Sequence, residues 1–251
     1  MFPRLVVSKY KFNLTNEQWD TLYKFTSEEF QKTQDCTRRV GKNSFYGLEI
    51  SWVKENILHN HPELDFLKKL FLEAVHHYFD TVHNVEIPAL TKFMISDSWF
   101  VTARDHGIDE PYFPTAIHNH AFSICSGVFY MDDSDHGTLM YSDPIKPPHW
   151  PFVWGGKNAR YKSDLTKDDV DEKLIKSEKG TLILFPGDTK HSSTVVRGAP
   201  DRRAVAFNVW PVGEVSDQEN ARLSTEADTL VDHRIFGNKL ASLQDFQGDN
   251  S

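Results

Sequence analysis

The chain has 251 residues, of which 39% are hydrophobic, 13% aromatic and 25% charged. This balance is typical of a globular protein and excludes a disordered or fibrous chain, and the length allows a core that needs neither disulfides nor a structural metal. The formal net charge of −8 makes nucleic acid an unlikely partner, because binding to phosphate backbones depends on clustered Lys and Arg.

The N-terminal third is expected to form an edge strand followed by helices. Residues 5–12 alternate apolar and polar side chains at their end, which is typical of a strand. Thr15 or Asn16 is expected to cap a first helix, because apolar residues follow at near-helical spacing. The longest helical pattern runs from Pro62 to about Val82 and carries a broad apolar stripe. No apolar stretch reaches the ~18 residues of a membrane span, and the N-terminus does not resemble a signal peptide, so we predict a cytoplasmic protein with no membrane partner.

After Pro88 the pattern changes to short strands separated by Gly, Pro and Asp. The predicted strands are 93–95, 98–102, 116–120, 127–131, 137–141, 180–185, 192–196 and 203–210. Many short strands after a helical start predict a mainly β fold with helices, either a sandwich or a barrel. Residues 144–179 interrupt the strands as an insertion that ends in a charged, helix-like stretch at 167–173. An insertion of this length is either a lid or binding loop or a loop without a function.

Three histidines are candidate metal ligands. His118 and His120 stand two residues apart on a predicted strand, so both side chains point to one face, roughly 7 Å apart at Cα. That spacing suits two ligands of one metal, although two surface histidines would show the same pattern. His191 follows a Pro-Gly turn at the start of another predicted strand, and the Arg202-Arg203 pair opens the next one.

The order of these motifs resembles the Fe(II)- and 2-oxoglutarate-dependent oxygenase superfamily, and it is also similar to prolyl-hydroxylase-type enzymes. The resemblance covers residues 95–212 and rests on three segments: His118 to Ser126-Gly127-Val128-Phe129-Tyr130, Phe185-Pro186 with His191, and Arg202 with Phe207-Asn208. It implies a double-stranded β-helix core, jelly-roll or cupin-like, over residues 93–212. Within a single domain of residues 1–251, residues 1–90 would form an α-rich support and residues 213–251 a polar C-terminal extension.

The resemblance also implies roles for five residues. His118, His120 and His191 would bind Fe(II) as a facial set, which leaves three positions open, two for 2-oxoglutarate and one for dioxygen. The distal carboxylate of 2-oxoglutarate needs a buried cation, and the resemblance assigns this role to Arg202. Arg203 is the alternative, since only one of the two can point into the barrel. Tyr130 matches a tyrosine that binds the same carboxylate in related enzymes, although it is equally well a buried aromatic residue.

One position departs from the superfamily pattern. Most members have Asp or Glu where His120 stands. Three neutral imidazoles leave the site with a charge of +2 in place of +1, which is expected to weaken Fe(II) retention and to alter reactivity. Asp143 is an alternative carboxylate ligand, although Asp-Pro after a strand is more typical of a turn.

The implied activity is that of a dioxygenase, a hydroxylase that couples decarboxylation of 2-oxoglutarate to C–H oxidation. Two alternatives stay open: a three-His, cupin-like metal-binding protein without 2-oxoglutarate turnover, and an oxygenase that uses dioxygen without 2-oxoglutarate. The insertion mixes aromatic and cationic residues, namely Trp150, Phe152, Trp154, Tyr161, Lys146, Lys157, Arg160 and Lys162. This mixture slightly favours a polar or macromolecular partner, and we predict a protein or peptide side chain as the primary substrate.

Overall fold

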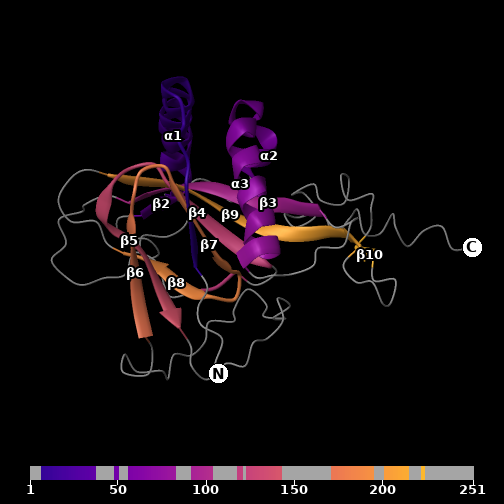
Figure 1. Cartoon of the computed structure of the whole chain (residues 1–251). Helices are drawn as coiled ribbons and strands as arrows, with labels where there is room; N and C mark the ends of the chain where they lie inside the picture. The colour runs from indigo at the N-terminus through magenta and orange to yellow at the C-terminus, as the bar shows by residue number, and fades with distance from the viewer. Residues whose placement is uncertain are drawn as a thin grey trace, which may run out of the picture.

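The core of the protein consists of two antiparallel sheets, seen in a computed structural model (Figure 1). The structure describes residues 7–37, 48–50, 56–82, 92–103, 118–120, 123–142, 171–194, 201–214 and 222–223. The strands are β1 (Ser8–Lys11), β2 (Leu48–Ile50), β3 (Lys92–Ala103), β4 (Cys125–Tyr130), β5 (Ser134–Ser142), β6 (Asp171–Ser177), β7 (Thr181–Pro186), β8 (Lys190–Ser193), β9 (Arg202–Glu214) and β10 (Arg222–Leu223). The larger sheet has the order β1-β7-β4-β9-β3-β2, with β10 paired to β9, and the smaller sheet has the order β6-β5-β8.

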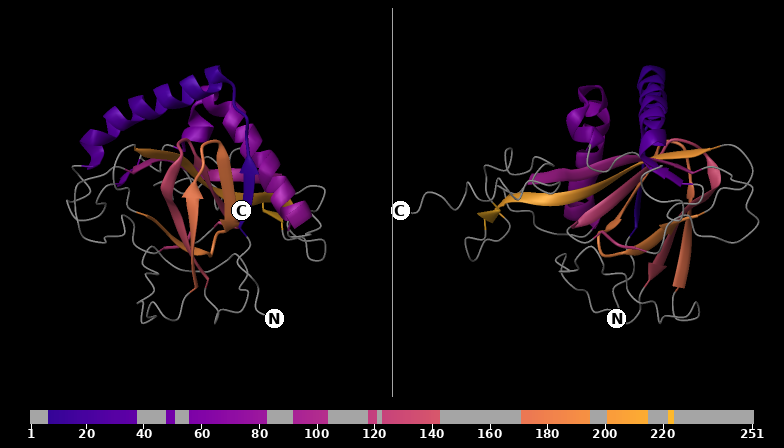
Figure 2. Two further views of the ribbon diagram at one scale, coloured as in Figure 1. Left: turned by 60° about the vertical axis from the view of Figure 1, so that its left-hand side comes forward. Right: turned by 180° about the vertical axis from the view of Figure 1, so that it is seen from behind.

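The helices of the described ranges lie along the side of the larger sheet that faces away from the smaller one (Figure 2). They are α1 (Asn16–Thr37), α2 (Ile57–Asn60) and α3 (Asp65–His77), with a 3-10 turn at Pro62–Leu64 and a π-helical turn at Tyr78–Val82. Thr15 caps α1: its hydroxyl accepts from the Gln18 N–H at 3.2 Å, and its own N–H donates to the Gln18 side chain at 2.9 Å. No helix in these ranges combines the length and apolarity that a membrane crossing requires.

The alternation of side chains along β9 separates two layers of core. Val205, Phe207 and Val209 pack into the cluster formed with the helices, where the Phe207 ring stacks on that of Phe71 at 4.6 Å between centroids. Ala204, on the opposite face of β9, belongs to a second cluster between the sheets, together with Tyr130, Met140, Ile175, Ile183 and Phe185. Two facing antiparallel sheets with helices on one side agree with the predicted mainly β architecture.

Three predicted elements differ from the observed ones. The predicted strand 116–120 shows, over its described residues 118–120, only a single bridge at His118. The predicted strands 93–95 and 98–102 are one strand, β3, whose pairing with β9 shifts between Ile95 and Asp97. The helix expected at 167–173 is wrong for residues 171–173, which begin β6. Exposed Leu174 alternates with buried Ile175 because successive side chains of a strand point to opposite faces. β6 is also an edge strand, and charged residues suit a solvated edge strand as well as a helix. Residues 171–177 of the predicted insertion 144–179 therefore form the edge strand of the smaller sheet.

Gly137 of β5 lies where a side chain cannot fit. A Cβ atom at this position would lie 1.9 Å from the backbone oxygen of Ile175 on β6. We expect Gly137→Ala to lower the free energy of unfolding by about 1–3 kcal/mol, because the two strands must separate to accommodate the methyl group. Urea unfolding measures the change. Asp135→Ala is the control on the same strand, where 87% of the side chain is exposed and no shift of the midpoint is expected; equal midpoints for the two variants would contradict this packing.

Candidate active site

The three predicted histidines come together at the edge of the smaller sheet. A single antiparallel bridge joins His118 to His191 of β8, with N–O distances of 3.0 and 2.9 Å. The backbone N–H of His120 donates to the Gly187 carbonyl at 2.8 Å, which holds the segment 118–120 beside the turn that leads into β8. The ring centroids of His118 and His120 lie 4.4 and 5.0 Å from that of His191.

This cluster fits a metal ion. One ligand atom from each of the three side chains lies within 4.8 Å of the other two. Two nitrogens bound to one ion at about 2.1 Å can be at most about 4.2 Å apart, so small side-chain rotations would close the site. His191 is buried, His120 is half-buried and His118 is exposed, so the site faces solvent on the His118 side. Within the described ranges, no other group of three or more His, Cys, Asp or Glu could hold a metal.

Two of the three imidazoles, those of His120 and His191, are in the neutral form that a metal requires. The Nδ1 of His191 lies 3.0 Å from the Thr189 carbonyl, and because a carbonyl only accepts, this nitrogen carries the proton and leaves Nε2 free. Burial lowers the pKa of His191 to about 3, with a further contribution from His118. Burial and the neighbouring His191 and His118 also hold the pKa of His120 well below its usual range. His120 and His191 are therefore neutral at physiological pH.

A cavity of about 90 Å³ lies between the two sheets and connects the histidines to Arg202 and Tyr130. Small and apolar side chains form most of its remaining wall. It is lined by Trp99, Val101, His118, His120, Ser126, Gly127, Val128, Tyr130, Thr138, Phe185, His191, Ser193, Arg202, Ala204, Ala206 and Phe207. Ser193 stands two residues after His191 on the same face of β8, roughly 7 Å along the strand.

Of the two candidate arginines, Arg202 points into the cavity. It is 3% exposed, and its guanidinium donates to the Gly137 carbonyl at 2.5 Å and to the Ser193 hydroxyl. Burial lowers its pKa, but a guanidinium keeps its charge in a protein. Arg203 lies on the opposite face of β9 and pairs with Asp132 at 2.7 Å. No ion pair within the described ranges involves Arg202, so its charge is buried without a carboxylate there.

Tyr130 lies beside Arg202 in the same cavity. Its hydroxyl donates to the Thr138 hydroxyl at 2.7 Å, and burial raises its pKa, so the group remains a neutral donor.

Sequence reasoning missed three residues that line the cavity, namely Thr138, Ser193 and Trp99. The Trp99 ring lies 5.7 Å from that of His120. Two-residue spacing from His191 was a signal for Ser193, whereas Thr138 and Trp99 have no distinguishing pattern. Asp143 and residues 144–170 of the predicted insertion lie outside the described residues.

Residues 97–208 match the protein family described as "Putative 2OG-Fe(II) oxygenase". This match lies within residues 95–212, the part of the sequence that resembles the Fe(II)- and 2-oxoglutarate-dependent oxygenase superfamily. This confirms the predicted resemblance, and the family takes its name from the two predicted cofactors. A comparison with curated proteins finds no match.

Three solved structures with TM-scores above 0.5 share the fold. The non-heme alpha-ketoglutarate-dependent carbocyclase SnoK from nogalamycin biosynthesis is 11% identical, with 86% of this chain and 85% of that chain covered and a TM-score of 0.52. AviO1 from Streptomyces viridochromogenes Tue57 is 10% identical, and the match covers 82% of this chain and 90% of AviO1 with a TM-score of 0.52. The epimerase SnoN from nogalamycin biosynthesis is 10% identical, and the match covers 82% of this chain and 78% of SnoN with a TM-score of 0.51. At identities this low, the structural similarity establishes the fold alone. It confirms the predicted double-stranded β-helix.

Proposed function

We propose that this oxygenase is a hydroxylase that couples decarboxylation of 2-oxoglutarate to oxidation of a C–H bond. The observation that carries the proposal is the buried guanidinium of Arg202, which shares one cavity with the three histidines. A buried charge is costly unless an opposite charge pairs with it. The distal carboxylate of 2-oxoglutarate would supply that opposite charge.

Each residue of the cavity has a proposed role. His118, His120 and His191 would hold Fe(II). The bound Fe(II) would activate dioxygen. Arg202 would bind the distal carboxylate through two N–H groups, with Ser193 orienting the guanidinium, and the Tyr130 O–H would turn from Thr138 to donate to the same carboxylate. Ala204 and Ala206 leave room for the carbon chain, and the apolar wall keeps water from the ion pair.

Arg202 also bears on the two alternatives. A metal-binding protein without turnover, or an oxygenase that uses dioxygen alone, needs the three histidines but has no use for a buried cation at this position. The cationic end of the cavity therefore favours 2-oxoglutarate as cosubstrate. SnoN and SnoK are named for epimerisation and carbocyclisation, so the choice of hydroxylation rests on our proposal and not on the shared fold.

Succinate formation tests the proposed function. The protein is loaded with Fe(II) and 2-oxoglutarate without oxygen and then exposed to air. We expect succinate and CO2 in equal amounts, formed slowly when no primary substrate is present. Oxygen consumption without succinate would favour the 2-oxoglutarate-independent oxygenase, and the absence of both would favour a metal-binding protein without turnover.

We propose that the primary substrate is a protein or peptide side chain. A cytoplasmic location of the oxygenase itself stays a prediction. The proposal rests on the aromatic and cationic residues of the insertion sequence. We expect deletion of residues 154–165 to abolish hydroxylation of a peptide library, detected as the gain of one oxygen atom by mass spectrometry, while succinate production without substrate continues. If both activities persist, the insertion does not recognise the substrate.

A further inference from the structure

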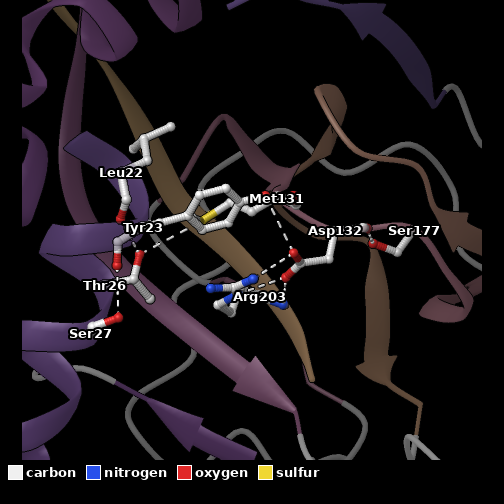
Figure 3. A network of polar contacts seen from close by, with 8 residues as sticks. All are labelled: Leu22, Tyr23, Thr26, Ser27, Met131, Asp132, Ser177 and Arg203. Atoms are coloured by element: carbon white, nitrogen blue, oxygen red, sulfur yellow. Dashed lines mark hydrogen bonds and ion pairs between the residues drawn. The ribbon is translucent and has the colours of Figure 1, made fainter. Parts of the chain in front are cut away.

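A carboxylate outside the barrel holds the first residues of β9. Asp132, in the turn after β4, accepts three hydrogen bonds from Arg203: from the backbone N–H at 2.9 Å, from Nε at 2.8 Å and from Nη2 at 2.7 Å (Figure 3). The backbone N–H of Met131 donates to the Arg203 carbonyl at 2.9 Å. Only 14% of the Asp132 side chain is exposed, so this pair is shielded from solvent more than an ordinary surface ion pair.

Other elements brace the same pair. The Arg203 guanidinium lies over the Tyr23 ring of α1, 4.3 Å from its centroid, and the Tyr23 hydroxyl donates to the Met131 carbonyl at 2.8 Å. The Ser177 hydroxyl at the end of β6 donates to the Asp132 carbonyl at 2.6 Å. Figure 3 shows these side chains converging from α1, β6 and β9 on the turn after β4. The carboxylate therefore has a defined position, and Arg203 cannot easily leave it.

The position of Arg203 determines that of Arg202. Neighbouring residues of a strand point to opposite faces, and a register slip of one residue exchanges the faces. With Arg203 held outside by its backbone and its side chain, Arg202 must point into the cavity. The same turn follows directly after Tyr130, which pairs with Ala204 of β9. One carboxylate thus holds the start of β9 in the register that places both residues proposed to bind the distal carboxylate of the cosubstrate.

We propose that Asp132 is a positioning residue for the 2-oxoglutarate site: it holds Arg203 outside the barrel and thereby directs Arg202 toward the cosubstrate. This inference rests on the proposed function, because it assumes that Arg202 binds the distal carboxylate. Asp132 itself does not line the cavity. Its loss should therefore affect only ligands that use Arg202.

Two 2-oxo acids separate positioning from general stability. Calorimetric titration of Mn(II)-loaded protein compares 2-oxoglutarate with 2-oxobutanoate, which has the same metal-binding end but lacks the distal carboxylate. For Asp132→Asn we expect the Kd of 2-oxoglutarate to rise at least about tenfold, because a displacement near 1 Å disrupts a two-pronged contact. The Kd of 2-oxobutanoate should stay within about twofold, because that acid makes no contact with Arg202. Asp135→Asn is the matched control, an exposed carboxylate paired with Lys176, and should change neither Kd.

Each other outcome has a distinct meaning. If Asp132→Asn weakens both acids equally, or neither, Asp132 has no positioning role and the inference is wrong. If the unmodified protein binds the two acids equally, the proposed function fails at Arg202, whatever Asp132 does. Should Asp132→Asn fail to fold, Arg203→Lys provides the test, since it keeps the charge and the backbone hydrogen bond but loses the two-pronged contact. We expect the same selective loss of 2-oxoglutarate binding, and an equal loss for both acids would overturn the proposal.

Discussion

His191→Ala is expected to abolish stoichiometric Fe(II) binding. His191 is the buried member of the cluster, and the Thr189 carbonyl fixes which of its nitrogens is free. Loss of a hydrogen bond to a metal-bound histidine typically weakens metal binding about 10- to 100-fold, so loss of the ligand itself should exceed about 100-fold. Iron content after gel filtration measures the effect, and His118→Ala and His120→Ala should give the same result.

His136 provides the control for these variants. It is a half-buried histidine of β5 that is not part of the metal-binding group, so His136→Ala should retain a full equivalent of iron. The alternative ligand is tested in the same series. If His120→Ala keeps full iron affinity while Asp143→Ala loses it, the three-His assignment is wrong and Asp143 is the third ligand.

The inward position of Arg202 was predictable because it depends on a local pattern. Small Ala204 and Ala206 alternate with bulky Val205 and Phe207, and the bulky residues suit the face that packs on helices. Period-two geometry then assigns Arg202 to the face with the alanines. The longest helix was predictable for a similar reason, since its apolar stripe is continuous along a single segment.

Contacts between distant strands were beyond prediction from local patterns. The segment 118–120 is not a regular strand, and its histidines meet through a bridge to His191 that depends on the position of β8. Asp132 and Arg203 are 71 residues apart. Their contact depends on the pairing of β4 with β9, which no spacing in the sequence indicates. β6 was misassigned because charged residues suit both a solvated edge strand and a helix.

Arg202→Met is expected to abolish 2-oxoglutarate binding at physiological concentrations without affecting the metal. Methionine fills much of the same volume but has no charge, so the distal carboxylate would be buried without a cation. Removing one partner of a buried, hydrogen-bonded charge pair costs about 2–5 kcal/mol, which corresponds to a rise in Kd of roughly 30- to 5,000-fold. Calorimetry on the Mn(II)-loaded protein measures this change directly.

Two comparisons show whether the lost affinity belongs to the distal carboxylate. Arg202→Lys keeps the positive charge but presents a single point of contact, so its Kd should lie between those of the unmodified protein and Arg202→Met. Binding of 2-oxobutanoate and of the metal should be unchanged in both variants, because neither ligand uses the guanidinium. If Arg202→Met binds 2-oxoglutarate as tightly as the unmodified protein, the buried cation has another purpose. The three histidines would then better fit an oxygenase that uses dioxygen alone.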